Sequence, residues 1–174
     1  MLKSKIDLII TSGAVSAGKF DFVPSVVNNF KLSNYFKSVA IRPGKPVLFA
    51  KIKGKQKAIF GLPGNPISSA ACFRFFVYPY LRNLLGIKEE TSFKATLKNK
   101  FIKKKNFTRF VKSKLSTTKN GKLEVQILKG QESFRIKSFI QSNIWVLLPS
   151  GKDKFKKGEI VNCFFPNQSN KIFL

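Results

Sequence analysis

Two glycine-rich loops contain the residues of this sequence that are best suited to binding an anion. The first loop comprises residues 12–21 and follows the apolar run 8–10, and the second loop comprises residues 61–66 and follows the run 58–60. An amphipathic helical pattern comes after each loop. Backbone amides at a helix start that lack an intrahelical partner can bind phosphates and similar anions. Because two such turns usually open at the same carboxyl edge of a parallel sheet, we expect both loops to face one site.

The second loop, Gly-Leu-Pro-Gly-Asn-Pro, predicts a rigid start to the helix that follows it. Gly61 and Gly64 allow a positive φ or the close approach of another backbone segment. Pro63 and Pro66 fix φ, and Pro66 loses no hydrogen bond at the first helical position. Asn65 is a good N-cap residue. The loop by itself is also compatible with a rigid turn that binds no ligand.

The first loop adds hydroxyl groups and a carboxylate. Ser12 and Ser16, together with the backbone at Gly13 and Gly18, can surround a phosphate-like group. Asp21 ends the loop, and its simplest role is to cap the next helix. Alternatively, its carboxylate faces the bound anion and holds a magnesium ion or acts in catalysis. An acid beside an anion needs a cation between them, so this second interpretation implies a metal.

A third segment, residues 42–46, is here called the cationic turn. Its sequence is Arg-Pro-Gly-Lys-Pro, and two prolines and a glycine make it rigid. Arg42 and Lys45 provide two positive charges that could face an anion. The alternative is a charged turn on the surface with no ligand.

The composition excludes several kinds of chemistry. The chain has no histidine, which removes His-based triads, His-ligated zinc and a histidine general base. Acid–base or metal chemistry must therefore depend on the eight carboxylates, on lysines or on backbone groups. Cys72 and Cys163 lie in separate apolar patterns, so we expect buried free thiols rather than a disulfide.

The net charge of +25 on 174 residues suggests an anionic partner, but only five of the 33 basic residues are arginine. Nucleic-acid interfaces favour arginine for its bidentate geometry, so we expect no specific nucleic-acid binding. The charge still favours anionic substrates. No apolar run reaches about 18 residues and the start does not resemble a signal peptide, so we expect a cytoplasmic protein without a membrane segment.

The elements that must position these residues follow from the hydrophobic periodicity, which indicates an α/β fold. Strands are predicted at 6–11, 36–41, 47–50 and 57–60, and helical patterns at 23–30 and 67–85. Lysines and a glycine at 53–55 predict a hairpin turn between the last two strands. We expect Pro79 to kink the long helix and Gly86 to cap it.

The pattern changes at about residues 87–92, which predicts two domains, 1–90 and 91–174. In the second domain, strands are predicted at 93–97, 110–115, 123–127, 145–148 and 159–165. Asn120 and Gly121 form a hairpin turn, and the whole reads as a small antiparallel barrel or sandwich. The lysine run 103–105 reads as a solvated loop. This half shows no constellation that suggests chemistry of its own.

The motifs resemble those of one family, the molybdopterin molybdotransferases, which include the E domain of gephyrin. Residues 6–23, IDLIITSGAVSAGKFDFV, resemble its DxxITSGGVSxGxxDYV segment, and residues 39–46, VAIRPGKP, resemble its xKPGKP turn. The second loop matches the GLPGNP motif completely. Order and spacing agree as far as residues 80–86, YLRNLLG. Weaker matches to the C-terminal β-barrel of the family follow at 108–110, 130–131, 142–143 and 148–149.

The resemblance implies a fold and a reaction. The fold is a partial three-layer molybdopterin-binding-type α/β domain followed by a small C-terminal β-barrel. The reaction is the last step of molybdenum cofactor biosynthesis. In that step adenylylated molybdopterin and molybdate react, molybdenum is inserted at the dithiolene sulfurs, and AMP leaves with the help of a divalent cation, here Mg²⁺. The full-length protein is expected to be a cytoplasmic homodimer.

Site residues follow from the same resemblance. Asp21 matches the active-site aspartate, which we expect to hold the metal, and Lys45 matches a lysine proposed to bind molybdate. Pro63 and Pro66 match prolines that line the molybdate pocket. Phosphate groups of the substrate would lie along residues 12–18.

This sequence departs from the family pattern in two places and in length. Ala14 replaces a glycine, and Arg42 replaces a lysine, which keeps the charge but changes its geometry. Family members are considerably longer and carry further N-terminal subdomains, so we expect this chain to be a C-terminal fragment that is inactive alone. Two other hypotheses stay open: a non-catalytic module that binds a pterin phosphate or oxyanion, and a basic nucleic-acid-binding protein.

Overall fold

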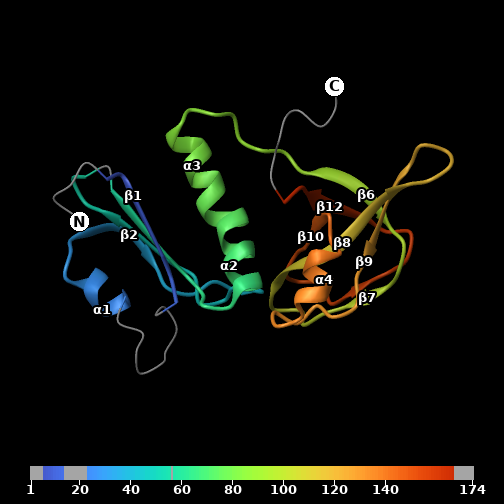
Figure 1. Cartoon of the computed structure of the whole chain (residues 1–174), viewed down its shortest axis with the longest axis horizontal. Coiled ribbons are helices and arrows are strands. Elements are labelled where there is room, and N and C mark those ends of the chain that lie inside the picture. Colours follow the sequence, from blue (N-terminus) through green and yellow to red (C-terminus); the bar gives the residue numbers. More distant parts are fainter. Residues whose placement is uncertain (1–5, 14–22, 56, 167–174) are drawn as a thin grey trace. The chain divides into compact units, whose positions relative to one another are not determined.

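The chain forms two compact units, Met1–Tyr80 and Leu81–Leu174. A computed structural model describes residues 6–13, 23–55 and 57–166, and each unit is considered by itself (Figure 1). The first unit is an α/β domain and the second contains a β-barrel, as the sequence predicted. Within these ranges no helix combines the length and the apolar character needed to cross a bilayer.

The first unit is built on a four-stranded sheet with the order β1-β5-β4-β2. Its strands are β1 (Leu8–Ser12), β2 (Leu32–Phe36), β4 (Leu48–Ile52) and β5 (Ala58–Leu62). β1 and β5 run parallel, and Ser12 lies opposite Leu62 at their carboxyl ends. β4 is antiparallel to both of its neighbours, which confirms the predicted hairpin.

Side chains alternate between the two faces of this sheet, and a helix covers each face. On one face, Val27 of α1 (Val23–Asn28) joins a core cluster with residues of β4 and β5, namely Leu48, Ala50, Ile52 and Ile59. On the other face the rings of Phe36, Phe49 and Phe60 stack across β2, β4 and β5, with centroids 5.6 and 4.8 Å apart. Tyr80 packs edge-on against the last two of these rings. The unit therefore has three layers.

The long helix predicted after the second loop is present, but it is not uniform. It comprises α2 (Pro66–Cys72), the π-helical turn η1 (Phe73–Val77) and α3 (Tyr78–Leu84). In the π turn the Tyr78 amide donates to the Phe73 carbonyl, five residues back. Pro79 lacks an amide hydrogen and its ring would clash with the carbonyl four residues earlier, so a widened turn just before it relieves the conflict. Gly86, at φ 65°, ends the helix as predicted.

The strand predicted at 36–41 was wrong. The strand there is β2, which ends at Phe36, and only the two-residue β3 (Ile41–Arg42) follows. The pairing of β2 with β4 shifts register between Leu32 and Asn34. A bulge of this kind breaks the alternation of apolar and polar residues, so the periodicity does not indicate a strand at this position.

The second unit contains a closed barrel of five strands in the order β10-β12-β6-β9-β8, with β8 also paired to β10. The strands are β6 (Phe93–Leu97), β8 (Thr108–Thr117), β9 (Leu123–Ile127), β10 (Ile144–Leu148) and β12 (Ile160–Phe164). The predicted hairpin at Asn120 and Gly121 joins β8 to β9. β6 and β9 pair in parallel, so the barrel is not wholly antiparallel as predicted. The other pairs of the barrel are antiparallel.

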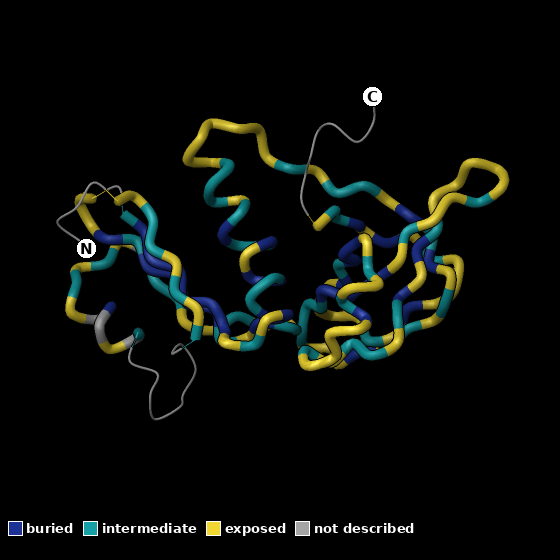
Figure 2. The backbone as a smooth tube through the Cα atoms, in the orientation of Figure 1, coloured by how far each residue is buried: buried dark blue, intermediate teal, exposed yellow. Residues whose placement is uncertain are grey.

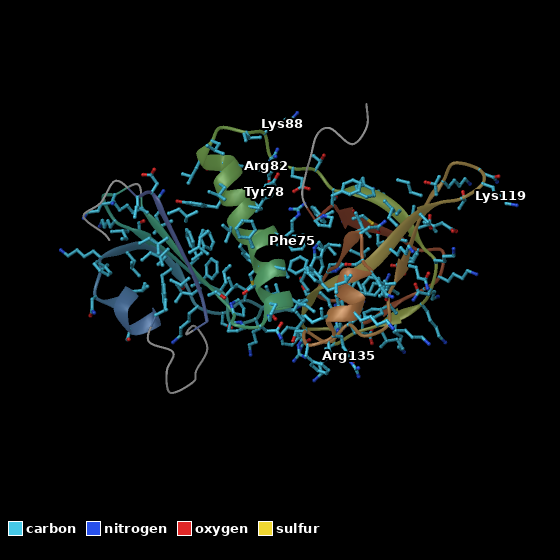
Figure 3. All side chains as sticks on the ribbon, in the orientation of Figure 1. Phe75, Tyr78, Arg82, Lys88, Lys119 and Arg135 are labelled. Atoms are coloured by element: carbon cyan, nitrogen blue, oxygen red, sulfur yellow. The ribbon has the colours of Figure 1, made fainter. Side chains whose placement is uncertain are left out.

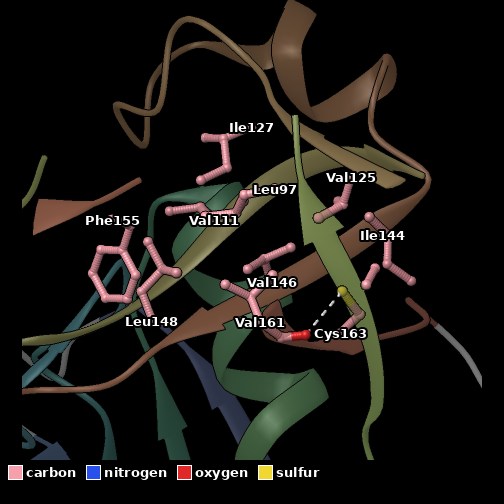
Figure 4. Packing of buried hydrophobic residues seen from close by; sticks show 11 residues of the cluster. Leu97, Val111, Val125, Ile127, Ile144, Val146, Leu148, Phe155, Val161 and Cys163 are labelled. Carbon is pink, nitrogen blue, oxygen red and sulfur yellow. Dashed lines mark hydrogen bonds between the residues drawn. The ribbon is translucent and has the colours of Figure 1, made fainter. Parts of the chain in front are cut away.

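Aliphatic side chains from all five strands fill the barrel (Figure 4). Val111, Val125 and Val146 are fully buried there, and the buried stretches of the strands follow this core (Figure 2). Cys163 and, in the first unit, Cys72 are buried free thiols, as predicted. Burial raises the pKa of each thiol to about 12, so both are protonated near neutral pH.

Three short elements complete the second unit: β7 (Phe101–Ile102), β11 (Lys154–Phe155) and α4 (Ile136–Ile140). The lysine run next to β7 is only partly a solvated loop, because Lys103 is buried. Its Nζ donates to the carbonyls of Phe107 (2.7 Å) and Lys104 (3.3 Å). These carbonyls, which the sequence pattern does not reveal, allow the ammonium group to lie inside.

Candidate anion-binding site

The two glycine loops begin side by side, as the sequence predicted. β1 and β5 are parallel neighbours, so the first loop leaves the sheet at Ser12 beside the point where the second loop leaves it. The Gly13 amide donates to the Leu62 carbonyl at 2.9 Å. Gly13 has a φ of 80°, which a residue with a side chain rarely adopts. Both loops therefore start at one edge of the sheet.

Gly64 lies near the backbone of the first loop and does not have a positive φ. A Cβ atom added at Gly64 would lie 3.6 Å from the Cα atom of Gly13, so the two loops approach each other through their backbones. The other glycine of this loop, Gly61, belongs to β5 and pairs with Thr11 and Leu48. Neither of the two roles predicted for these glycines is required at Gly64, because a Cβ atom there would make an ordinary van der Waals contact.

The helix start is capped as predicted, which reduces the number of free amides. The Asn65 side chain accepts from the Ser68 amide at 3.2 Å, and Pro66 is the first residue of α2. Because Pro66 has no amide hydrogen and that of Ser68 is occupied, fewer donors remain than the sequence suggested. Any anion held here must depend more on side chains and on loop amides.

The Pro63 carbonyl ties the two loops to the helix. Ser12 Oγ lies 3.5 Å from this carbonyl oxygen, at the limit of a hydrogen bond, and Ser69 Oγ of α2 also donates to it. Pro63 is buried. Ser12 thus lies at the junction of both loops, and Ser69 is a site residue that the sequence analysis missed. The sequence signal that could have identified Ser69 is a hydroxyl residue in the first turns of the helix that follows the second loop.

The cationic turn packs against the same helix. Gly44 has a φ of 101°, and a Cβ atom there would collide with Cys72 Sγ and lie 3.5 Å from the Ser68 carbonyl oxygen. Cys72 Sγ donates to the Gly44 carbonyl at 3.5 Å. Arg42 and Lys45 are exposed on either side of this contact. The turn is therefore fixed on α2, the helix that begins at the second loop.

The described part of the first unit does not by itself form a divalent-cation site. Within residues 6–13, 23–55 and 57–166 no group of three His, Cys, Asp or Glu side chains could hold a metal. Residues 1–80 contain two carboxylates, Asp7 and Asp21. Asp7 lies next to the amino end of β1, whereas the loops leave from its carboxyl end.

Three of the predicted site residues, Ser16, Gly18 and Asp21, lie outside the described residues, as does Ala14. The predicted residues that are described lie in the two loops or the cationic turn, which meet each other or α2. The arrangement combines backbone amides, hydroxyls and two exposed cations. This combination suits a tetrahedral oxyanion or a phosphate group.

Comparison with known families assigns both halves of the chain. A family model described as "Probable molybdopterin binding domain" matches residues 1–83. A second, described as "MoeA C-terminal region (domain IV)", matches residues 94–164.

Individual relatives agree with this assignment. A "Molybdopterin molybdenumtransferase" from Staphylococcus aureus (strain COL) is 36% identical over 161 residues, which are 91% of this chain and 38% of the relative. One from Staphylococcus epidermidis (strain RP62A) is 35% identical over 169 residues, which are 96% of this chain and 40% of the relative. A solved structure of a "molybdopterin biosynthesis moea protein" from Pyrococcus horikosii has a TM-score of 0.67 and 28% identity, and the match covers 93% of this chain and 38% of that one.

Proposed function

Because the chain belongs to the MoeA family of molybdopterin molybdotransferases and spans about 38% of the relative it matches, we propose that it forms the substrate-binding part of such an enzyme. The proposed reaction inserts molybdenum from molybdate into adenylylated molybdopterin and releases AMP. One observation carries this proposal. The first loop meets the second at one sheet edge, and the cationic turn packs on α2, the helix that begins at the second loop.

Each segment has a proposed share in binding. The hydroxyl of Ser12, continued by Ser16 and Gly18, would bind phosphate oxygens of the adenylylated substrate. Gly13, whose amide donates to the Leu62 carbonyl, would hold the start of this loop in place. Molybdate is a tetrahedral dianion, and it would lie at the second loop. There Lys45 and Arg42 supply charge-assisted hydrogen bonds.

A magnesium ion belongs to the proposal through Asp21. When bound, it would neutralise charge on the phosphate group that leaves with AMP. Residues 1–80 contain two carboxylates, Asp7 and Asp21. Asp7 lies next to the amino end of β1, away from the loops, so a cation held at the loops would depend on Asp21. We also propose, from the family, that the full-length protein is a homodimer in the cytoplasm.

A second candidate function is a module that binds the pterin phosphate or an oxyanion without turnover. It is favoured by the described residues of the two loops and the cationic turn, whose hydroxyls, helix start and exposed cations suit the holding of an oxyanion. Such a module would show the same dependence of binding on the two loops and on Lys45. It would release no AMP.

Binding and turnover measured together separate these functions. Because the 174-residue chain is expected to be inactive alone, a full-length protein that contains it is mixed with adenylylated molybdopterin, molybdate and Mg²⁺. AMP release is followed by chromatography and binding by calorimetry. Binding with AMP release that Asp21→Asn abolishes supports the transferase. Asparagine still caps a helix, so this variant should remain folded. Binding without AMP release supports the module, and absence of both contradicts both candidates.

A further inference from the structure

A cavity of about 450 Å³ opens on the second unit beside α4. Its charged lining residues are three cations, Lys129, Arg135 and Lys137, and one carboxylate, Glu132. Glu132 lies 4.0 Å from the Arg135 guanidinium. No ion pair between described side chains involves Lys129 or Lys137, so the cavity carries an excess of positive charge.

Three large apolar side chains are exposed next to this cavity. Phe134 is 68% exposed, Ile136 44% and Ile140 76%, all within or directly before α4. The guanidinium of Arg135 lies over the Phe134 ring, with its Cζ atom 5.4 Å from the ring centroid. Two other arginines of the chain stack on phenylalanine rings at 5.3 and 5.5 Å. Residues 129–141, here called the α4 surface, therefore display apolar groups between cations. Clustered exposed apolar side chains mark interaction sites more often than isolated ones do.

The backbone beneath the α4 surface is held by a buried lysine. Lys112 of β8 is 2% exposed, and its Nζ donates to the carbonyls of Gly130 (2.7 Å), Glu132 (3.0 Å) and Arg135 (3.2 Å). The Ser138 hydroxyl, also buried, lies within hydrogen-bond distance of the carbonyls of Gly130 and Arg135. Hydrogen bonds to an ammonium group are among the stronger ones in proteins.

Gln131 completes this support from the same segment. Its side-chain amide pairs with the Lys112 backbone in both directions, at 2.9 and 2.7 Å, and donates to the Leu128 carbonyl at 2.8 Å. The segment is thus fixed to β8 although its apolar side chains face outward. A surface that is rigid before binding loses less entropy when it binds.

We propose that the α4 surface docks an acidic protein segment that carries apolar side chains. The carboxylates of the partner would face Lys129, Arg135 and Lys137, and its apolar side chains would cover Phe134, Ile136 and Ile140. A second α4 surface fits poorly here, since it would present the same excess of positive charge. A free phosphate would leave the apolar side chains uncovered. The proposal is independent of the proposed enzyme function.

The test uses the 174-residue chain and a set of short fluorescent peptides in which Leu or Phe alternates with Asp or Glu. Binding is followed by fluorescence anisotropy at low and moderate salt. We expect Ile140→Ser, Phe134→Ser and Lys137→Glu each to weaken binding by about tenfold or more. Peptides with Lys in place of the acids, or Ser in place of the apolar residues, should not bind.

Matched controls lie on the same unit, away from α4. Ile160→Ser removes an isoleucine of β12 that is 64% exposed, and Lys119→Glu reverses a charge in the hairpin between β8 and β9. Figure 3 labels Lys119 and Arg135 at well-separated places of this unit. We expect both controls to change binding by less than about twofold.

Each other outcome overturns the proposal. These are failure of the whole peptide set to bind, equal loss in the controls and the α4 variants, and binding by inorganic phosphate that competes fully with the peptides. Binding of phosphatidylserine vesicles that the α4 variants abolish, without peptide binding, would assign the surface to a membrane instead. Circular dichroism of each variant confirms that the exposed substitutions leave the fold intact.

Discussion

Gly44 is the residue on which the position of the cationic turn depends. Its φ of 101° favours glycine, and its missing side chain makes room for Cys72 Sγ. Lys45, next to it, is the cation proposed to bind molybdate. The placement of this charge therefore depends on two uncharged residues that make no contact with a ligand in the proposal.

We expect Gly44→Ala to lower the free energy of unfolding of the first unit by about 1–3 kcal/mol from backbone strain alone. The clash with Cys72 Sγ adds to this loss. Urea denaturation followed by tyrosine fluorescence measures it, because all three tyrosines, Tyr35, Tyr78 and Tyr80, lie in the first unit. In a Cys72→Ala background the loss should be smaller, since the colliding sulfur is gone. Equal losses in both backgrounds would contradict the contact.

Lys45→Ala should weaken molybdate binding by about 1.5–3 kcal/mol, the value of a charge-assisted hydrogen bond. Calorimetric titration with molybdate measures the change. Lys53→Ala is the control, because Lys53 is an exposed lysine in the hairpin turn between β4 and β5, at the opposite end of these strands from the loops. An equal loss in the two variants would assign the effect to net charge and not to the site.

At the scale of elements, Lys112 and Ser138 share two acceptors, and this predicts a non-additive pair of substitutions. Lys112→Met removes three hydrogen bonds. The Ser138 hydroxyl can still donate to the carbonyl of either Gly130 or Arg135, and the Glu132 carbonyl keeps the Arg135 amide as a donor. We expect it to cost about 1.5–3 kcal/mol, and the double variant with Ser138→Ala to cost more than the sum of the two single variants. Denaturation followed by Trp145 fluorescence reports this unit. A strictly additive result would show that the two donors do not substitute for one another.

The same lysine predicts a pH dependence of stability. Burial lowers the pKa of Lys112, the largest effect, and the charge of Arg109 acts in the same direction against that of Glu132. Between this lowered pKa and about 10.4, the value in the unfolded chain, the unfolded state binds more protons, so the contribution of Lys112 to the unfolding free energy rises with pH. The difference in stability between wild type and Lys112→Met should therefore rise across the alkaline range. A difference that stays flat or falls would contradict the lowered pKa.

How far the sequence predicts these elements depends on whether the determining contacts are local. The strand-loop-helix units, the Asn65 cap, the Gly86 stop and the hairpins follow from neighbouring residues, and the structure has them. α4 was missed because its N-cap residue, Arg135, makes no side-chain cap bond and its apolar residues face outward. Lys103 was predicted to lie in a solvated loop, and the burial of Lys112 was not predicted, because the carbonyls that accept their hydrogen bonds are brought into place only by the folded loops.

The site was predictable to a similar extent. The meeting of the two loops at one sheet edge follows from the parallel pairing that their flanking runs indicate. The packing of Gly44 on Cys72 is a contact between residues 28 positions apart, so the local sequence pattern does not predict it. The same holds for the Pro63 carbonyl, which receives Ser12 from 51 positions away.

At the scale of the whole molecule, the aromatic residues divide between the units in a useful way. The three tyrosines lie in Met1–Tyr80, and the single tryptophan, Trp145, is buried in β10 of the second unit. We expect the urea transitions followed by tyrosine and by tryptophan fluorescence to have different midpoints, because each unit has its own hydrophobic core. Coincident transitions would instead show that the two units unfold cooperatively.

The contact between Gly13 and Gly64 has a further consequence, for how the two loops respond to ligands. The Gly13 amide also donates to the Leu62 carbonyl at 2.9 Å, so the start of the first loop is bonded to the strand end from which the second loop continues. A shift of one loop on binding is therefore transmitted to the other. If the first loop binds the pterin phosphate and the second binds molybdate, the two ligands are thermodynamically coupled. Each must then change the affinity for the other by the same factor.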